Sequence, residues 1–96
     1  NDHMAIAAME TLRHRLGLAV PGDVSVVGFD DIAQAAWPSF DLTTVAQDVD
    51  RMVEATRSLV MEQMKGEHRP RHIGVAGRLV ERGSCMRRLL PGEKVV

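Results

Sequence analysis

The 96-residue sequence contains one cysteine, no tyrosine and no long run of apolar residues. A lone cysteine, Cys85, excludes an internal disulfide, and no Cys/His cluster with zinc-ligand spacing accompanies it. No apolar stretch reaches the roughly 18 residues that a membrane-spanning helix needs, and the first residues do not resemble a signal peptide. Twelve basic and thirteen acidic residues give a net charge of -1, which argues against a strongly basic nucleic-acid-binding module. We therefore expect a soluble intracellular domain without membrane contact.

Two amphipathic helices are predicted from apolar residues that recur at three- and four-residue spacing. The first follows Asn1 and Asp2, which are good N-cap residues, and should end at Gly17. The second follows Asp48 and should end at Gly66. Its expected apolar stripe consists of Val49, Met52, Val53, Thr56, Leu59, Val60 and Met64.

Two short strands are predicted between these helices. Val24–Phe29 is almost continuously apolar, which is typical of a strand buried on both faces of a parallel sheet. Leu42–Val45 is the second strand, and residues 32–36 form one or two helical turns that end at Trp37, since Pro38 follows it. An extended stretch begins at Arg71. This order favours an α/β fold with a three-layer, mainly parallel sheet that is truncated on its N-terminal side.

Polar residues follow the predicted strands, which is where ligands bind in open α/β sheets. Asp30 and Asp31 follow Val24–Phe29, Gln47 follows the second strand, and Asn1 would follow a strand if one preceded it. Such side chains suit the hydroxyls of a sugar or the edge of a nucleobase. Alternatively, the aspartates cap a turn and Asn1 caps a helix. A divalent cation at the aspartates lacks a third carboxylate or a lysine nearby.

No constellation of catalytic residues is evident. The histidines are scattered among polar segments without a paired nucleophile or carboxylate; they are His3, His14, His68 and His72. Ser84 and Cys85 lie in no nucleophile-elbow or Cys/His context. Trp37 suits a pocket wall or an interface anchor as well as a plain core position. We expect a protein that is not an enzyme and that uses no cofactor and no metal.

Four stretches, in the right order and spacing, resemble the C-terminal part of the effector-binding domain in the LacI/GalR family of bacterial transcription regulators. They are residues 1–5, residues 17–31, residues 42–48 and residues 79–84, and the longest includes the specific run Val20–Asp31. The resemblance implies a type I periplasmic-binding-protein-like fold, in which two α/β subdomains close on a small effector. Residues 1–84 would form most of the C-terminal subdomain, and residues 85–96 would form a C-terminal tail.

The resemblance also implies which residues bind the effector. Asn1, Asp30 and Gln47 match positions that face the cleft between the subdomains, and Phe29 lies near it. Asp2 matches a structural position, a helix cap. The implied ligand is a small polar molecule such as a sugar or a nucleobase.

A dimer surface is implied as well, formed by Ile6, Met9 and Arg13 on the first helix together with Trp37 as an anchor. The implied protein is a homodimeric cytoplasmic repressor that contacts operator DNA through an N-terminal helix-turn-helix, which these residues do not include. As it stands, the chain is expected neither to bind DNA specifically nor to enclose a ligand. The alternative is a periplasmic sugar-binding protein of the same fold.

Overall fold

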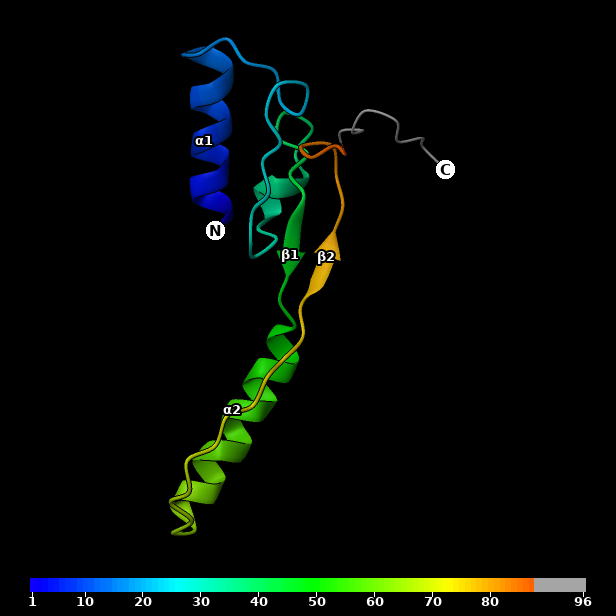
Figure 1. Cartoon of the computed structure of the whole chain (residues 1–96). Coiled ribbons are helices and arrows are strands. Elements are labelled where there is room, and N and C mark those ends of the chain that lie inside the picture. Colours follow the sequence, from blue (N-terminus) through cyan, green and yellow to red (C-terminus); the bar gives the residue numbers. More distant parts are fainter. Residues whose placement is uncertain (88–96) are drawn as a thin grey trace, which may run out of the picture.

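The computed structural model describes residues 1–87, which form an elongated molecule of 57 × 33 × 20 Å (Figure 1). One end holds helix α1 (Asp2–His14), the short 3-10 helix η1 (Ala33–Ala36) and strands β1 (Thr44–Ala46) and β2 (Arg78–Val80). The other end holds helix α2 (Val49–Met64), and the chain from residue 67 to residue 77 runs back along it. Most of the predicted tail, residues 88–96, lies outside the described residues, so the tail stays a prediction.

Helix α1 begins and ends close to the predicted positions. The Asn1 side-chain oxygen accepts a hydrogen bond from the Met4 N–H at 2.9 Å, as an N-cap does. Gly17 has a φ of 64°, the left-handed conformation that glycine adopts without strain beyond a helix end. The residues that α1 buries are Asp2, Ala5 and Met9.

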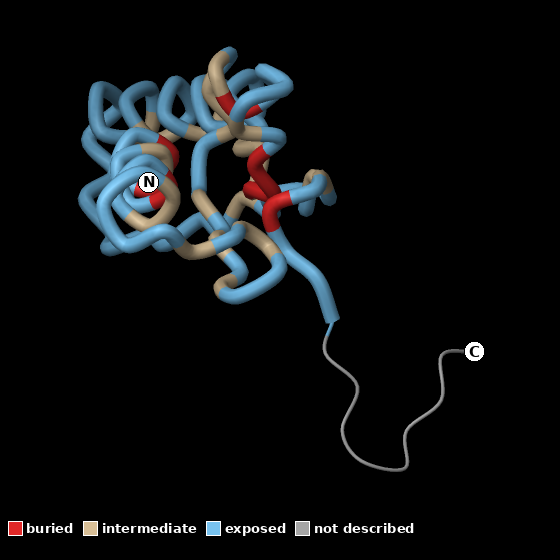
Figure 2. Tube along the Cα trace, turned by 90° about the horizontal axis from the view of Figure 1, so that it is seen from above, coloured by how far each residue is buried: buried red, intermediate tan, exposed pale blue. Residues whose placement is uncertain are grey.

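A small hydrophobic core lies between α1, η1 and the chain leading into β1. It consists of Ala5, Met9, Ala35 and Leu42, with Ile6, Val20, Val26, Ile32 and Phe40 packed around it. Figure 2 shows that buried residues form a few short segments in a chain that is otherwise exposed or half-buried. Met9 is fully buried in this core. Its predicted place on a dimer surface is therefore wrong, because the stripe that carries Met9 faces the interior of its own chain.

Strand β1 has neighbours on both edges. On one edge it pairs with β2 in the antiparallel direction. On the other edge Val24–Phe29 and the next residue run parallel to it, and the N–H groups of Gly28 and Asp30 donate to the carbonyls of Thr43 and Val45, each at 2.9 Å. Within residues 1–87 the regular sheet is thus antiparallel, and parallel pairing is limited to isolated bridges. The expected mainly parallel sheet is not formed by these residues.

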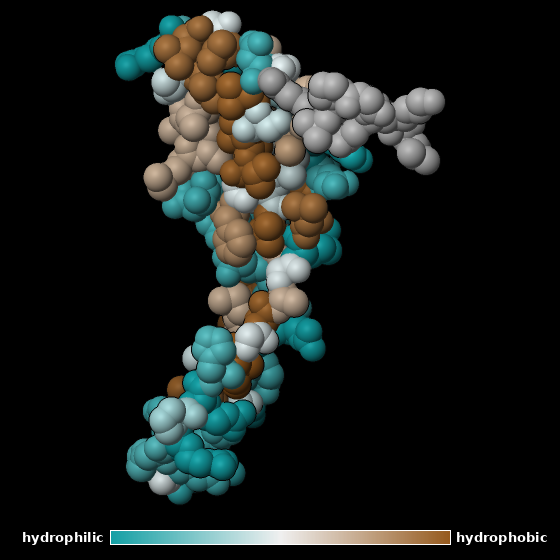
Figure 3. Space-filling model, viewed as in Figure 1, coloured by the Kyte–Doolittle hydropathy of each residue, from teal (hydrophilic) through white to brown (hydrophobic). Residues whose placement is uncertain are grey.

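The segment Val24–Phe29 is covered on one face, whereas the sequence predicted burial on both. Val26 packs against the core, whereas Val27 is 53% exposed and Phe29 is 48% exposed. Side chains of an extended chain alternate between its two faces, and the described residues cover only the face of Val26. Apolar residues are accordingly visible on the surface around the sheet, whereas the far end of α2 is hydrophilic (Figure 3).

Helix α2 has the predicted ends but no buried residue. The Asp48 side chain accepts a hydrogen bond from the Arg51 N–H at 3.1 Å, and Gly66 follows the helix with a φ of 86°. Its apolar stripe is exposed, with Val53 at 62%, because the segment 67–77 covers only part of it. No helix within residues 1–87 is long and apolar enough to cross a membrane.

Candidate functional site

Two of the predicted ligand-binding residues are in direct contact. Asp30 follows Val24–Phe29, Gln47 follows β1, and the Gln47 side-chain amide donates to the Asp30 carboxylate at 2.6 Å. Asp30 is exposed and Gln47 is half-buried. The pair therefore presents an acceptor and a donor to solvent from the carboxyl ends of two parallel neighbouring segments.

The two other predicted residues lie at the same end of these segments. The Asp2 N–H donates to the Phe29 carbonyl at 3.1 Å, which places the start of α1 against the end of Val24–Phe29. The Phe29 side chain is about half exposed, and Asn1 is exposed. The helix-cap reading of Asn1 is confirmed, because its oxygen is bound to the Met4 N–H. The Asn1 amide can still donate to a ligand, so the two roles are compatible.

The backbone at the aspartates is strained. Asp30 has a φ of 127° and Asp31 has a φ of 57°, values that residues other than glycine rarely adopt. Strain of this kind costs on the order of 1–3 kcal/mol per residue and persists only where surrounding contacts fix it. The Asp30 N–H is held by the Val45 carbonyl at 2.9 Å, and the Asp31 N–H is held by the Thr44 hydroxyl at 3.3 Å. Aspartate adopts a positive φ more readily than most residues, but residue type alone does not indicate which aspartates do so. Two of the three non-glycine residues with positive φ within residues 1–87 lie at the candidate site, and the third is Asp41.

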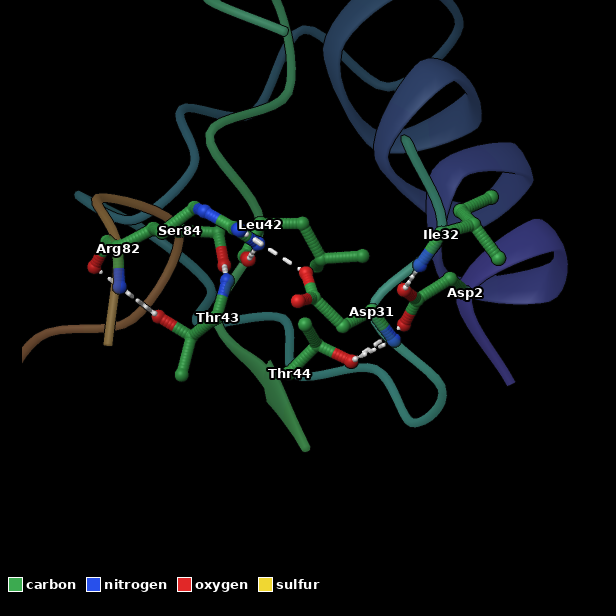
Figure 4. Close-up of polar contacts among 8 residues, drawn as sticks. All are labelled: Asp2, Asp31, Ile32, Leu42, Thr43, Thr44, Arg82 and Ser84. Carbon is green, nitrogen blue, oxygen red and sulfur yellow. Dashed lines mark hydrogen bonds and ion pairs between the residues drawn. The ribbon is translucent and has the colours of Figure 1, made fainter. Parts of the chain in front are cut away.

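Asp2 is a fully buried carboxylate that joins three elements. Its two oxygens accept hydrogen bonds from the Ile32 N–H at 2.9 Å and from the Thr44 hydroxyl at 2.6 Å (Figure 4). Asp2 is therefore structural, as the resemblance implied, but the capping residue is Asn1. Its position in the sequence does carry a signal, because Asp2 precedes Ala5 by three residues and so lies on the stripe that α1 buries.

Arg82 and Ser84 are site-supporting residues that sequence reasoning missed. The Arg82 guanidinium donates to the Asp31 carboxylate at 2.9 Å and to the Leu42 carbonyl at 2.9 Å. The buried Ser84 hydroxyl donates to the Val26 carbonyl at 2.6 Å. These contacts join positions more than 35 residues apart, so no local pattern indicates them.

The two aspartates do not point at one position. Asp30 is bound to Gln47, whereas Asp31 forms an ion pair with Arg82 (Figure 4). Within residues 1–87 no group of three or more histidine, cysteine, aspartate or glutamate side chains could hold a metal ion. The arrangement thus suits hydrogen bonding to an organic ligand better than a hard cation.

The remaining predicted dimer residues differ in exposure. Trp37 is 54% exposed and stacks on Phe40, with ring centroids 6.3 Å apart. Ile6 is partly buried against the core. Arg13 donates to the carbonyls of Ser39 and Val20, so it ties α1 to the loop that carries Trp37. Trp37 is accordingly the most prominent of these side chains on the surface.

Open grooves flank Gln47 on the side of α2. One, of about 580 Å³, is lined by Gln47, Val49, Met52, Val53, Thr56 and Arg57. Another, of about 250 Å³, lies between α2 and the returning chain that carries Ile73 and Val75, and Gln47 lines it too. Gln47 therefore lies where the Asp30 contact meets the exposed apolar face of α2.

Comparison with known proteins gives consistent matches. The sequence model of a family described as periplasmic binding protein-like domain matches residues 1–85. The HTH-type transcriptional regulator MalR of Streptomyces coelicolor is 41% identical over 95 residues, which are 98% of this chain and 27% of MalR. The HTH-type transcriptional repressor PurR of Aliivibrio salmonicida is 37% identical over 73 residues, which are 76% of this chain and 22% of PurR. The chain belongs to the effector-binding domain of the LacI/GalR family.

Solved structures of LacI/GalR proteins have the same fold. The transcriptional repressor AscG of Escherichia coli matches with a TM-score of 0.69 and 37% identity, over 91% of this chain and 32% of AscG. The lac repressor dimer bound to operator and an anti-inducer matches with a TM-score of 0.78 and 29% identity, over 91% of this chain and 30% of that chain. This LacI/GalR chain spans about a quarter of the length of the curated relatives it matches. These relatives are transcriptional regulators, so the periplasmic sugar-binding alternative is not favoured.

Proposed function

We propose that the chain is the effector-sensing and dimerising part of a LacI/GalR repressor, and that it binds a small polar ligand such as a sugar or a nucleobase. The observation that carries this proposal is the contact between Asp30 and Gln47 at the carboxyl ends of adjacent parallel segments. The carboxylate accepts hydrogen bonds from ligand hydroxyls or ring N–H groups, and the amide donates or accepts beside it. When the ligand binds, it takes over part of the bonding that Asp30 and Gln47 now give each other.

Asn1 and Phe29 complete the ligand surface in this proposal. Phe29 offers a half-exposed aromatic face on which the apolar face of a sugar ring or a nucleobase packs. Asn1 adds an amide donor at the start of α1. The four side chains together combine one charge, two amides and one apolar surface, which is the mixture that a polar ring compound requires.

The complete domain, as we propose it, has a three-layer and mainly parallel sheet in which Val24–Phe29 and β1 are neighbours. The parallel bridges from Val27 to Thr43 and from Asp30 to Ala46 support this arrangement. In such a sheet the second face of Val24–Phe29, which Val27 now exposes, is covered by another layer. The cleft then opens between this subdomain and the second subdomain of the complete protein.

The proposed mechanism is a shift between two arrangements of the subdomains. A ligand that binds the closed arrangement more tightly than the open one shifts the population toward closure. Closure changes the affinity for operator DNA, which an N-terminal helix-turn-helix of the whole cytoplasmic regulator contacts. Couplings of this kind are typically about 1–3 kcal/mol, or roughly 5- to 150-fold in affinity.

Homodimerisation is part of the same proposal. Trp37 is the anchor, since a half-exposed tryptophan stacked on Phe40 presents a large rigid apolar surface. Ile6 lies on α1, and Arg13 holds the Trp37 loop against that helix. The dimer surface therefore consists of α1 and the Trp37 loop, without Met9.

The test is calorimetric titration of a full-length regulator that contains this chain with D-glucose, D-galactose, maltose, hypoxanthine and guanine. We expect one class of compound to bind and the Asp30→Ala variant to bind it at least tenfold more weakly, because a hydrogen bond to a charged group contributes about 1.5–3 kcal/mol. The control is Glu10→Ala, which removes an exposed carboxylate on α1, outside the proposed ligand surface, and should leave the affinity unchanged. Equal affinity of Asp30→Ala and the wild type would show that Asp30 does not bind the effector.

A further inference from the structure

The two consecutive aspartates have separate partners. The Asp30 carboxylate is bound to the Gln47 amide and is exposed. The Asp31 carboxylate is bound to the Arg82 guanidinium, and the two side chains are only 24% and 18% exposed. Adjacent residues thus direct one carboxylate toward the proposed ligand and the other toward the interior.

Arg82 is itself held in place by two further residues, Leu42 and Thr43. Its second guanidinium nitrogen donates to the carbonyl of the fully buried Leu42 at 2.9 Å. The backbone N–H of Arg82 donates to the Thr43 hydroxyl at 2.9 Å, and that hydroxyl donates to the backbone carbonyl of Arg82 at 3.0 Å. The planar guanidinium is therefore a fixed point beside the chain that leads into β1 (Figure 4).

The strained turn depends on such fixed points. Two successive residues with positive φ persist only where contacts on several sides determine their conformation. The Val45 carbonyl and the Thr44 hydroxyl hold the two N–H groups, and the contact with Arg82 fixes a side chain of the turn. Without Arg82, the Asp31 carboxylate would carry an uncompensated charge beside Asp30 and would be free to compete for the Gln47 amide.

We propose that Arg82 is a positioning residue of the effector site. It binds Asp31, and through Asp31 it fixes the turn that directs Asp30 toward Gln47. It also neutralises Asp31, so that Asp30 supplies the single negative charge at the site. A site with one carboxylate beside an amide selects uncharged ligands that donate hydrogen bonds, such as polyhydroxyl compounds, and this role rests on the proposed function of Asp30.

The experiment uses the side-chain amide signals of the 96-residue chain in nitrogen-15 NMR spectra. The sequence has one asparagine and three glutamines, so only four such pairs of signals need to be assigned. In the wild type we expect the chemical shifts of the Gln47 pair to be displaced from those of a side-chain amide without a carboxylate partner. Asp30→Asn should abolish this displacement. We expect Arg82→Gln to abolish the displacement as well, and Asp31→Asn to have the same effect. The double variant with Arg82→Gln and Asp31→Asn should show no larger effect than either single variant. Arg82→Lys keeps a cation opposite Asp31 and should restore most of the displacement.

Two controls separate positioning from general stability. Arg57→Gln makes the same change at an exposed ion pair on α2 and should leave the Gln47 signals unchanged. Ser84→Ala removes the buried hydroxyl bonds to Val26 and Thr43 and should lower the unfolding midpoint without moving the Gln47 signals. If Ser84→Ala reduced the displacement of the Gln47 signals as much as Arg82→Gln does, the proposal would be overturned, since both effects would then be merely structural. Unchanged Gln47 signals in Arg82→Gln and Asp31→Asn would also overturn it, as would a wild-type chain without dispersed signals.

Ligand titrations distinguish this proposal from the proposed function. Galactose and hypoxanthine are titrated into the full-length regulator that carries each variant. Weaker binding in Arg82→Gln and in Asp30→Ala supports both proposals. If ligand binding were unchanged in Arg82→Gln and Asp30→Ala while Arg82→Gln still abolished the displacement of the Gln47 signals, the ligand role of Asp30 would be rejected. Weaker binding in Asp30→Ala alone would reject Arg82 as a positioning residue.

Discussion

Replacement of Asp2 by asparagine tests how the candidate site is supported. The substitution keeps the size of the side chain, so it opens no cavity and removes only the charge and one acceptor. Asp2 is fully buried and accepts hydrogen bonds from the Ile32 N–H and the Thr44 hydroxyl. The asparagine oxygen can accept one of these bonds, but its NH₂ group then faces the other donor. The turn after Asp31, α1 and β1 would lose their common contact.

The expected cost follows from these two bonds. A hydrogen bond to a charged group contributes about 1.5–3 kcal/mol, and a buried donor left without a partner costs about 1–3 kcal/mol. Asp2→Asn should therefore lower the free energy of unfolding by about 3 kcal/mol, a large part of the 5–15 kcal/mol typical of a domain. With a urea dependence of about 2 kcal/mol per M, the unfolding midpoint falls by about 1.5 M.

Urea unfolding followed by the fluorescence of Trp37, the sole tryptophan, measures this change. The matched control is Asp50→Asn, which changes an exposed aspartate in the first turn of α2 and should shift the midpoint little. A shift for Asp2→Asn as small as that of the control would refute the reasoning. It would mean that the three elements are held together without the buried carboxylate.

Two further predictions concern the core and the dimer surface. Met9→Ala should lower the free energy of unfolding by about 2–5 kcal/mol because Met9 is fully buried, whereas Met4→Ala on the exposed face of α1 should change it by less than about 0.5 kcal/mol, both measured by urea unfolding. The wild-type chain should sediment as a larger species at high than at low concentration, and Trp37→Ala should abolish that dependence. A wild-type chain that stays monomeric at both concentrations would contradict the proposed dimer surface.

Local elements were the most predictable part of the fold. The N-caps Asn1 and Asp48, the glycines that follow the helices and the end of η1 before Pro38 depend on backbone preferences of a few neighbouring residues. Each of these was predicted from the sequence and is confirmed. The meeting of Asp30 with Gln47 was also accessible, because the carboxyl ends of parallel neighbours lie at one edge.

Contacts between distant residues were not accessible from the sequence. The apolar run Val24–Phe29 indicates a segment that is suited to burial on both faces, but what covers each face depends on the rest of the fold. Met9 was misplaced because an apolar residue on an amphipathic helix suits a core and an interface equally. The partner of Arg82 is Asp31, 51 residues away, and only the three-dimensional structure pairs them.

The central claim is that Asp30 and Gln47 meet the effector at the ends of adjacent parallel segments. The most direct measurement is a crystal structure of a full-length regulator containing this chain, determined with a compound that calorimetry shows to bind. We predict a ligand donor about 3 Å from the Asp30 carboxylate, with the Gln47 amide on the same ligand. A ligand bound elsewhere, with the contact between Asp30 and Gln47 unchanged, would contradict the claim.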